Sequence, residues 1–588
     1  MSRARGSCRS RGSSPWPPSL YSGYSVSGSV NESFNAGWTS TRWIPGGIGV
    51  YVGFLFLAPR FHALGKSRGY MTVSHFIYDR YLPCSSTAPW VAHLLRVLSF
   101  AALQLPIFTY LITQFQALGI EVRTFTGGAV SPIIAVCVAA GVLLISDVLG
   151  GMRSVAYTDV VQGVVLFLGS IIFLVIQRTE LGGLAAAAQF YRNPANAAIP
   201  AVAAMQTVPS PTAIVSYFDF VIKTTIAATM FPHLSQRLFA GRSPAVVKRG
   251  LAVMGFTFFA VQLSSMITGW VGIAALAGTV AKGESAFSKM LMLVAGKGTG
   301  QAFLAALLLA AAICAMMSTA DSALLAFSVM WTVDLYKPYV RPNASSRELL
   351  FFGRVMSVIG LAIGVTLGLL TIQTGTPNLS ALFSLQNVTP IHVAPAVWLG
   401  LHWRGLRGEA VAAGMVAGLG VTVGLVFSQY NTGLVRGLDA TACGLSTAMI
   451  GFFVNITITV ALGLLLQARP GLFGDAAAAA KAAYERLDIG PKRDRMLNAP
   501  LLGFLFLLLL FTAPFCFKSG APNVFVGDMA AWAFVALLLS GVLAIVTAAA
   551  YLFLWEDYQE PGSSLPMGAS DAKDVADFGE QRAGIAAD

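Results

Sequence analysis

The sequence predicts an all-α protein that crosses a membrane many times. Only 11% of its 588 residues are charged, 56% are hydrophobic, and the mean hydropathy is +0.70. Soluble domains carry about 25% charged residues, so this composition cannot cover a water-exposed surface of the same mass. The apolar residues also fall in runs of roughly 20 or more, which is the length that an α-helix needs to cross a hydrocarbon core of about 30 Å.

Thirteen apolar stretches qualify as membrane spans, and a weaker one precedes them at 19–37. The thirteen are 42–62, 91–119, 127–149, 157–177, 211–237, 247–275, 300–333, 346–371, 378–402, 407–428, 438–467, 498–518 and 526–555. Alternate loops hold about twenty Lys and Arg residues on one side and about eight on the other. Because basic loops stay on the cytoplasmic side, we expect the richer side and the C-terminus to be cytoplasmic.

The chain divides into five predicted parts. These are a basic, disordered N-terminus (1–18), a transmembrane core (19–467), a cytoplasmic loop with a short helix (468–497), two additional transmembrane helices (498–555) and a cytoplasmic tail (556–588). No polar segment is long enough for a soluble catalytic domain. The six cysteines show no C-x-x-C pair, and the net charge of +12 accompanies no nucleic-acid-binding motif. We therefore expect the partners to be a lipid bilayer and small molecules, and no nucleic acid.

Two spans contain polar residues that need a reason, because such residues are costly in lipid. Asp159 lies just inside 157–177, and Ala315, Ser318 and Thr319 share one face of 300–333 by their i, i+3, i+4 spacing. Hydroxyls and freed backbone carbonyls are the ligands that transporters with broken helices offer to Na⁺. The alternatives are that these residues pack helices together and that Asp159 reaches the interface or caps a helix. Spacing alone leaves both interpretations open.

Four segments, in order, resemble the sodium:solute symporter family, which includes proline, glucose, pantothenate and urea carriers. They are SDVLGGMRSVAYTDVVQGVVL (146–166), FPHLSQRLFAGRS (231–243), MSTADSALLAFSVMWTVDLYKPY (317–339) and PAVWLGLHWRGLRGEAVAAGMVAG (395–418). The resemblance implies a transporter core of two inverted five-helix repeats (5+5) with broken helices, followed here by extra C-terminal helices.

The same resemblance implies the ion site. Sodium, as coupling ion, would be held by the hydroxyls of Ser318 and Thr319 and by the carbonyl of Ala315, and Asp159 would lie on its inward route. Further ligands would come from the backbone of the first core helix, at Pro18 and Tyr21. No other cofactor is expected.

The solute site is implied at the break of the first core helix, at Ser22, Gly23 and Tyr24. Thr224 occupies the position where proline carriers have an aromatic residue, which weakens a proline assignment. Gln114, in the third core helix, could face the solute or be hydrogen-bonded between helices.

The N-terminal end departs from the family pattern. Residues 19–24, SLYSGY, supply the motif of the first core helix, but MSRARGSCRSRGSSPWPP stands where its upstream half belongs. A run of prolines at 15, 17 and 18 can start a helix but cannot continue one backwards through lipid. We expect a wrongly assigned first exon or a truncated gene.

The implied function is sodium-coupled symport of a small polar organic solute by alternating access, in the plasma membrane. No nucleophile–base pair or metal cluster points to an enzyme. Two alternatives remain: an uncoupled channel-like, sensor-like or inactive remnant, and a proton-coupled carrier that uses Asp159. The solute stays open among amino acids, urea, pantothenate, sugars and monocarboxylates.

Overall fold

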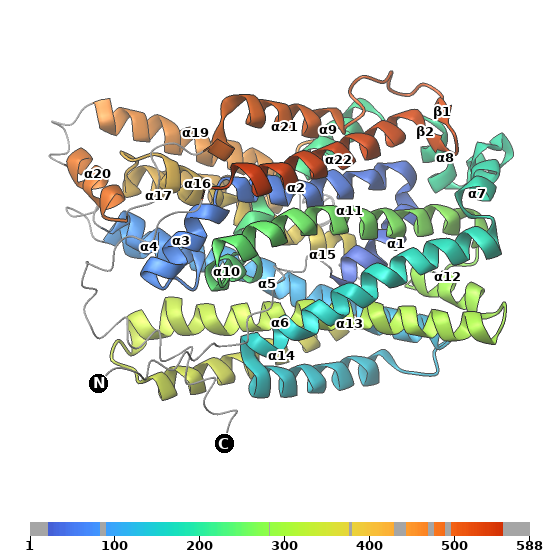
Figure 1. Ribbon diagram of the computed structural model, residues 1–588, viewed down its shortest axis with the longest axis horizontal. Helices are drawn as coiled ribbons and strands as arrows, with labels where there is room; N and C mark the ends of the chain where they lie inside the picture. Colours follow the sequence, from blue (N-terminus) through green and yellow to red (C-terminus); the bar gives the residue numbers. More distant parts are fainter. Residues whose placement is uncertain are drawn as a thin grey trace, which may run out of the picture.

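The computed structural model describes residues 22–82, 90–281, 283–375, 379–428, 443–468, 476–487 and 495–556. This part of the chain is almost entirely helical, and most of the helices run along the long axis of the molecule (Figure 1). The described strands, β1 (Phe525–Val526) and β2 (Met529–Ala530), form one small antiparallel hairpin. The fold therefore fits an all-α membrane protein.

The helices follow one another with short connections. In the first half they are α1 (Ser29–Ala36), α2 (Trp43–Leu55), α3 (Ala58–Arg68), α4 (Val73–Tyr81), α5 (Trp90–Phe125), α6 (Pro132–Leu181), α7 (Gly183–Arg192), α8 (Pro200–Gln206), α9 (Pro211–Ala227), α10 (Pro232–Ala240) and α11 (Pro244–Ala275). In the second half they are α12 (Ala286–Ala295), α13 (Thr299–Met330), α14 (Ser346–Thr374), α15 (Leu379–Gln386), α16 (Ala394–His402), α17 (Gly408–Ser428), α19 (Thr447–Ala468), α20 (Ala476–Leu487), α21 (Ala499–Phe511) and α22 (Ala531–Ala549).

Short π- and 3₁₀-helical segments interrupt or extend these helices. The π segments are η1 (Tyr24–Gly28), η6 (Trp331–Val340) and η11 (Ala550–Leu554). The 3₁₀ segments are η2 (Gly37–Arg42), η4 (Pro194–Ala198), η5 (Ala228–Met230), η7 (Pro390–His392) and η10 (Arg495–Leu497). Such segments often mark functional sites, because they change the direction in which side chains and backbone groups point.

Local sequence explains where the long helices begin. α6, α9 and α11 each start with a serine N-cap followed by proline, at 131–132, 210–211 and 243–244. The serine hydroxyl accepts one of the free N–H groups of the first turn, and the fixed φ of proline suits the first helical position.

The predicted spans correspond to helices in the described part of the chain. Nine helices there are long and apolar enough to cross a membrane. The other four predicted spans are also helical: 42–62 lies in a helix pair bent by 53°, 127–149 and 498–518 match shorter apolar helices, and 378–402 is broken into α15, η7 and α16. Nine and four make the thirteen that the sequence predicts.

One predicted loop is wrong. We expected a loop between 149 and 157, around Arg153, but the backbone of α6 is helical from Pro132 to Leu181. The reason is local, because no proline follows Pro132 within this stretch and nothing forces the helix to stop. Its two apolar arms, Pro132–Asp147 and Gly163–Leu181, are the two spans that the sequence predicts.

The two ends of the bundle carry different short elements. α3, α4 and α20 lie at one end, which we call the α20 end, whereas α7, α8, α12 and the β-hairpin lie at the other, the α12 end (Figure 1). α20 is the short helix predicted between 468 and 497. The C-terminal helices α21 and α22 lie beside α2 and α11, where the Tyr551 hydroxyl donates to the Tyr51 carbonyl at 2.5 Å.

A buried ion pair ties α9 to α19. Lys223 Nζ lies 3.4 Å from Asp219 Oδ2, and both side chains are at most 3% exposed. The other oxygen of Asp219 accepts from the backbone N–H and the hydroxyl of Ser446, at 3.0 and 3.1 Å, just before α19 begins. The carboxylate thus balances the lysine charge and caps a second helix at once.

Candidate functional site

The three residues predicted on one face of α13 are placed as expected. Ala315, Ser318 and Thr319 are all buried, with at most 5% of their surface exposed. The Thr319 hydroxyl donates to the Ala315 carbonyl at 3.1 Å, one turn back along the helix. Because its proton is committed to the backbone, the lone pairs of this hydroxyl are turned outward, which is the arrangement that a cation ligand needs.

The start of the described first helix lies against this part of α13. A Cβ atom added to Gly23 would lie 2.4 Å from Met316 Cγ and 2.8 Å from Gln114 Oε1, which is closer than real contacts allow. The Gly23 N–H donates to Gln114 Oε1 at 2.8 Å. Gly23 has an ordinary right-handed helical conformation, so glycine is needed here for the close approach of the backbone.

Gln114 is therefore hydrogen-bonded between helices, which was the second of the two predicted roles. Its Nε2 also donates to the Tyr110 carbonyl within α5, at 3.4 Å. The side chain is 1% exposed and lies between α5 and the first helix. Ser22, beside Gly23, is buried as well.

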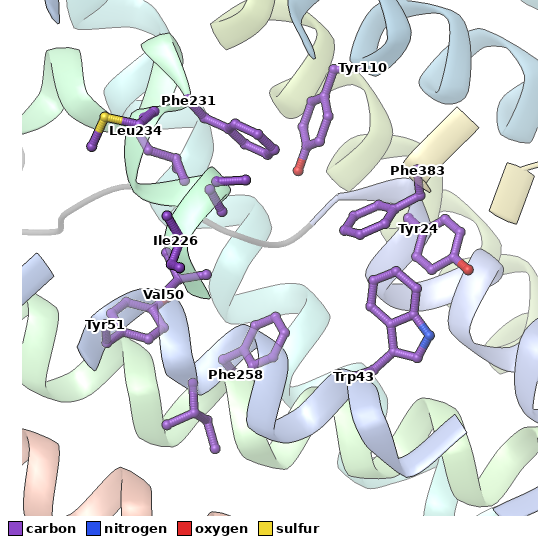
Figure 2. Packing of buried hydrophobic residues seen from close by; sticks show 14 of the residues in the cluster. Tyr24, Trp43, Val50, Tyr51, Tyr110, Ile226, Phe231, Leu234, Phe258 and Phe383 are labelled. Atoms are coloured by element: carbon purple, nitrogen blue, oxygen red, sulfur yellow. The ribbon is translucent and has the colours of Figure 1, made fainter. Parts of the chain in front are cut away.

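Four aromatic rings gather next to the first helix. The ring centroid of Tyr24 lies 4.4 Å from that of Trp43 and 5.0 Å from that of Phe383, and Trp43 lies 4.6 Å from Phe220. Figure 2 shows Tyr24, Trp43 and Phe383 together, from three separate parts of the chain. These rings form an apolar wall at the place where the sequence predicts the solute.

Thr224 lies one turn beyond Phe220 on α9 and faces α2. A Cβ atom on Gly46 would lie 3.2 Å from the Phe220 ring and 3.7 Å from Thr224 Cβ. The Thr224 side chain is 4% exposed, and its hydroxyl has no hydrogen-bond partner among the described residues. A buried hydroxyl without a partner costs free energy, which makes this hydroxyl a candidate to bind the solute.

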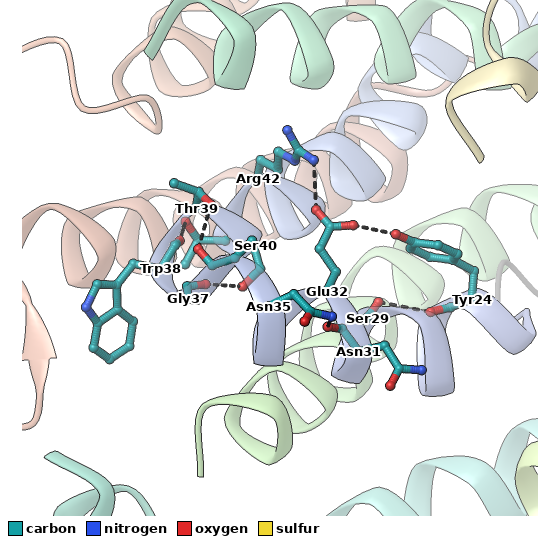
Figure 3. A network of polar contacts seen from close by, with 12 residues as sticks. Tyr24, Ser29, Asn31, Glu32, Asn35, Gly37, Trp38, Thr39, Ser40 and Arg42 are labelled. Atoms are coloured by element: carbon teal, nitrogen blue, oxygen red, sulfur yellow. Dashed lines mark hydrogen bonds and ion pairs between the residues drawn. The ribbon is translucent and has the colours of Figure 1, made fainter. Parts of the chain in front are cut away.

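A polar chain leads away from the aromatic wall. The Tyr24 hydroxyl donates to one oxygen of Glu32, and Arg42 pairs with the other oxygen at 2.8 Å (Figure 3). The Arg42 guanidinium also lies over the Phe220 ring, 4.7 Å from its centroid. The pair thus holds α1, η2 and α9 together around the rings, and sequence reasoning did not identify it.

Asp321 is a second residue that sequence reasoning missed. It lies two residues after Thr319, is 3% exposed, and accepts a hydrogen bond of 3.5 Å from Ser146 of α6. The next residue, Ser322, accepts from Arg237 of α10. An acidic residue inside an apolar span was the available signal, by the same rule that singled out Asp159.

Three predicted site residues cannot be compared with the structure. Asp159 lies in α6, in a stretch whose side chains fall outside the description. Pro18 and Tyr21 precede the first described residue. Their roles remain predictions.

A further polar cluster joins α4, α5 and η6 at the α20 end. Asp334 accepts from the Thr72 hydroxyl at 2.8 Å, and the Arg96 and His75 side chains each lie 3.9 Å away. Burial, together with the charge of Arg96, lowers the pKa of His75 to about 3. His75 is therefore neutral at physiological pH, and Arg96 is the cation that balances Asp334.

Comparisons with known proteins bear on this geometry. The family model described as the sodium:solute symporter family matches residues 27–418. The chain is 25% identical over 480 residues to the osmoregulated proline transporter OpuE of Bacillus subtilis, covering 80% of this chain and 88% of that one. It is 23% identical over 427 residues to the sodium/pantothenate symporter of Haemophilus influenzae, covering 70% and 82%.

One solved structure shares the fold. The substrate-bound, outward-open structure of a Na⁺-coupled sialic acid symporter matches with a TM-score of 0.55 at 14% identity, covering 76% of this chain and 87% of that one. At this identity the likeness concerns the fold alone. It confirms the predicted fold class, a helical membrane transporter core.

Proposed function

The chain belongs to the sodium:solute symporter family, and from that premise we propose that it moves a small polar organic solute across a membrane together with Na⁺. The observation that carries this proposal is the contact of the first helix with α13. Gly23 reaches the side chain of Met316 in the same turn of α13 that holds Ala315, Ser318 and Thr319. A cation bound on α13 would therefore lie close to the helix that forms the solute wall, and the two binding events would be coupled.

In this proposal the cation is held by Ser318, Thr319 and the Ala315 carbonyl. The outward-turned lone pairs of Thr319 support this role, and Pro18 and Tyr21 would add backbone carbonyls. Asp321 adds a carboxylate within one turn of the hydroxyl pair, so a monovalent cation would find a nearby opposite charge. Asp159 would be the acidic group on the way to the α20 end.

The solute would lie between the first helix and α9. Its apolar part would pack on Tyr24, Trp43 and the neighbouring rings, and the Thr224 hydroxyl would bind a polar group. Gln114 would act indirectly, because it fixes the Gly23 backbone. The rings contact one another, so we propose that the wall opens when solute enters, as alternating access requires.

We further propose the plasma membrane as location, with the α20 end and the C-terminus in the cytoplasm. A membrane potential of 100 mV contributes about 2.3 kcal/mol for each charge that crosses. One Na⁺ per solute would thus support roughly fifty-fold accumulation of a neutral solute before the sodium gradient is counted.

A binding experiment tests the shared ion and solute site. Purified protein would be screened for thermal stabilisation by amino acids, sugars, pantothenate, urea and monocarboxylates, in NaCl and in choline chloride. We expect one class to stabilise only when Na⁺ is present, and we expect Thr319→Val to remove that dependence. The matched control is Thr332→Val, since the Thr332 hydroxyl also donates one turn back, to Ser328 at 2.7 Å, but lies farther along the same helical span. Equal loss of stabilisation in both variants would refute the proposed site.

A further inference from the structure

A second set of buried oxygens lies at the α12 end, away from Ser318 and Thr319. The Glu121 side chain of α5 accepts hydrogen bonds from three serine hydroxyls. Ser27 comes from the π-helical segment η1, whereas Ser285 and Ser288 come from the start of α12, with Ser285 at 2.7 Å. All four side chains are 0% exposed. Three elements that are far apart in sequence thus converge on one carboxylate.

Asn31 of α1 completes the arrangement. Its Nδ2 donates to the hydroxyls of Ser27 and Ser285, at 3.4 and 3.3 Å, and its Oδ1 accepts the N–H of Ala286 at 2.7 Å. Figure 3 shows that the Asn31 side chain points away from Glu32 and Arg42, so this network is separate from the chain beside the aromatic wall. Glu121 also lies seven residues beyond Gln114, which is about 10 Å along the axis of α5.

The charge of Glu121 has no cationic partner in the described part of the chain. The nearest basic residues along the sequence are otherwise engaged: Arg123 donates to the Gly283 carbonyl, and Lys289 pairs with Glu284 at 3.0 Å. Every interaction recorded for Glu121 comes from a serine. The N-terminus of α12 adds only a partial positive charge. A buried carboxylate inside an apolar span is costly unless a cation or a proton balances it.

We propose that Glu121, Ser27, Ser285 and Ser288 form a binding site for a monovalent metal cation, with Na⁺ as the physiological occupant. Hard cations take several oxygen ligands, and these four residues supply two carboxylate and three hydroxyl oxygens. The serine hydroxyls can rotate their protons away from the carboxylate and turn lone pairs toward a cation. One carboxylate balances one positive charge, so a monovalent ion fits better than a divalent one.

This site also has a mechanical consequence. Its ligands come from η1, α5 and α12, so a bound cation fastens α12 to the first helix and to α5. Ser27 lies only four residues after Gly23, within the segment that carries Tyr24 of the aromatic wall. Occupancy of the Glu121 site therefore favours one position of the first helix, and solute affinity depends on it by linkage.

Equilibrium binding of ²²Na⁺ to the purified full chain in lipid nanodiscs tests the proposal. We expect Glu121→Gln, which keeps an acceptor but removes the charge, to lower the number of Na⁺ ions bound at saturation by one. Ser288→Ala keeps the charge and removes one hydroxyl, and we expect it to weaken binding at this site about tenfold or more. Glu284→Gln is the matched control, because it removes a nearby acidic group that is partly exposed and already paired with Lys289, and it should bind as the native protein does.

Combination with Thr319→Val separates this site from the proposed coupling site. If both sites exist, each single variant lacks one ion and the double variant lacks two, and the ion that remains in the Glu121→Gln protein shows that this variant is folded. Native stoichiometry in Glu121→Gln overturns the proposal, and this is also the result for a carboxyl that binds only a proton. Should Glu121→Gln not fold, an unchanged sodium affinity in Ser288→Ala overturns it instead.

Discussion

The buried pair of Asp219 and Lys223 allows a quantitative prediction about what holds the bundle together. Lys223 lies near the middle of the α9 span, it is 3% exposed, and Asp219 is its recorded ion-pair partner. Replacing Asp219 by leucine leaves an ammonium group in an apolar environment without a counter-charge. Breaking a buried pair in this way costs about 3–5 kcal/mol, and a charged side chain in mid-membrane costs about 2.5–3.5 kcal/mol on insertion scales.

The reverse change is expected to cost less. After Lys223→Met, the Asp219 carboxylate keeps two donors from Ser446 and the positive N-terminus of α19. We therefore expect a loss of about 1–2 kcal/mol. In the double variant Asp219→Leu/Lys223→Met neither charge remains, so the loss should fall about 2 kcal/mol short of the sum of the single losses.

Equilibrium unfolding in mixed micelles of mild and denaturing detergent, followed by tryptophan fluorescence, measures these free energies. The matched control is Glu284→Leu, which breaks an ion pair whose side chains are 25% exposed and should cost less than about 1 kcal/mol. Equal losses for the two single variants, or losses that simply add in the double variant, would refute the asymmetry that the Ser446 contacts imply.

Two further predictions concern the first helix and the cluster at the α20 end. Gly23→Ala places a Cβ atom 2.4 Å from Met316 Cγ, so overpacking of about 1–3 kcal/mol should lower solute uptake at least fivefold, and Met316→Ala in the same chain should restore part of it; no recovery would contradict the steric reason. Because the folded protein lowers the pKa of His75 to about 3, it binds fewer protons than the unfolded chain, and this contribution to stability is present above about pH 6.5 and lost as the pH falls toward 3. Thermal melts at pH 7.5 and 4.5 should therefore differ less for His75→Gln than for the native chain, and an equal difference would contradict the sign.

The sequence was sufficient wherever the signal is local. The lengths of the apolar runs predict the spans, and the i, i+3, i+4 spacing predicts that Ala315, Ser318 and Thr319 share a face of one helix. The loop expected around Arg153 failed for a physical reason as well. Hydropathy dips at charged residues, but a helix stops only where its backbone is forced to stop.

Long-range contacts could not be predicted in this way. The rings of Trp43, Phe220 and Phe383 meet because three broken or bent segments converge, and no single stretch of sequence records that convergence. Glu121 looks like an ordinary residue near the end of a span until η1 and α12 bring serines to it. Asp321 was different, because an acidic residue in an apolar span was visible in the sequence.

Solute uptake into proteoliposomes tests the central claim most directly. With a solute that the binding screen identifies, an inward Na⁺ gradient should drive accumulation above equilibrium, and an interior-negative potential should increase it. Replacement of Na⁺ by choline should abolish accumulation in the native chain, and Thr319→Val should do so in Na⁺ while Thr332→Val does not. Equal uptake in choline and in Na⁺ would contradict the account.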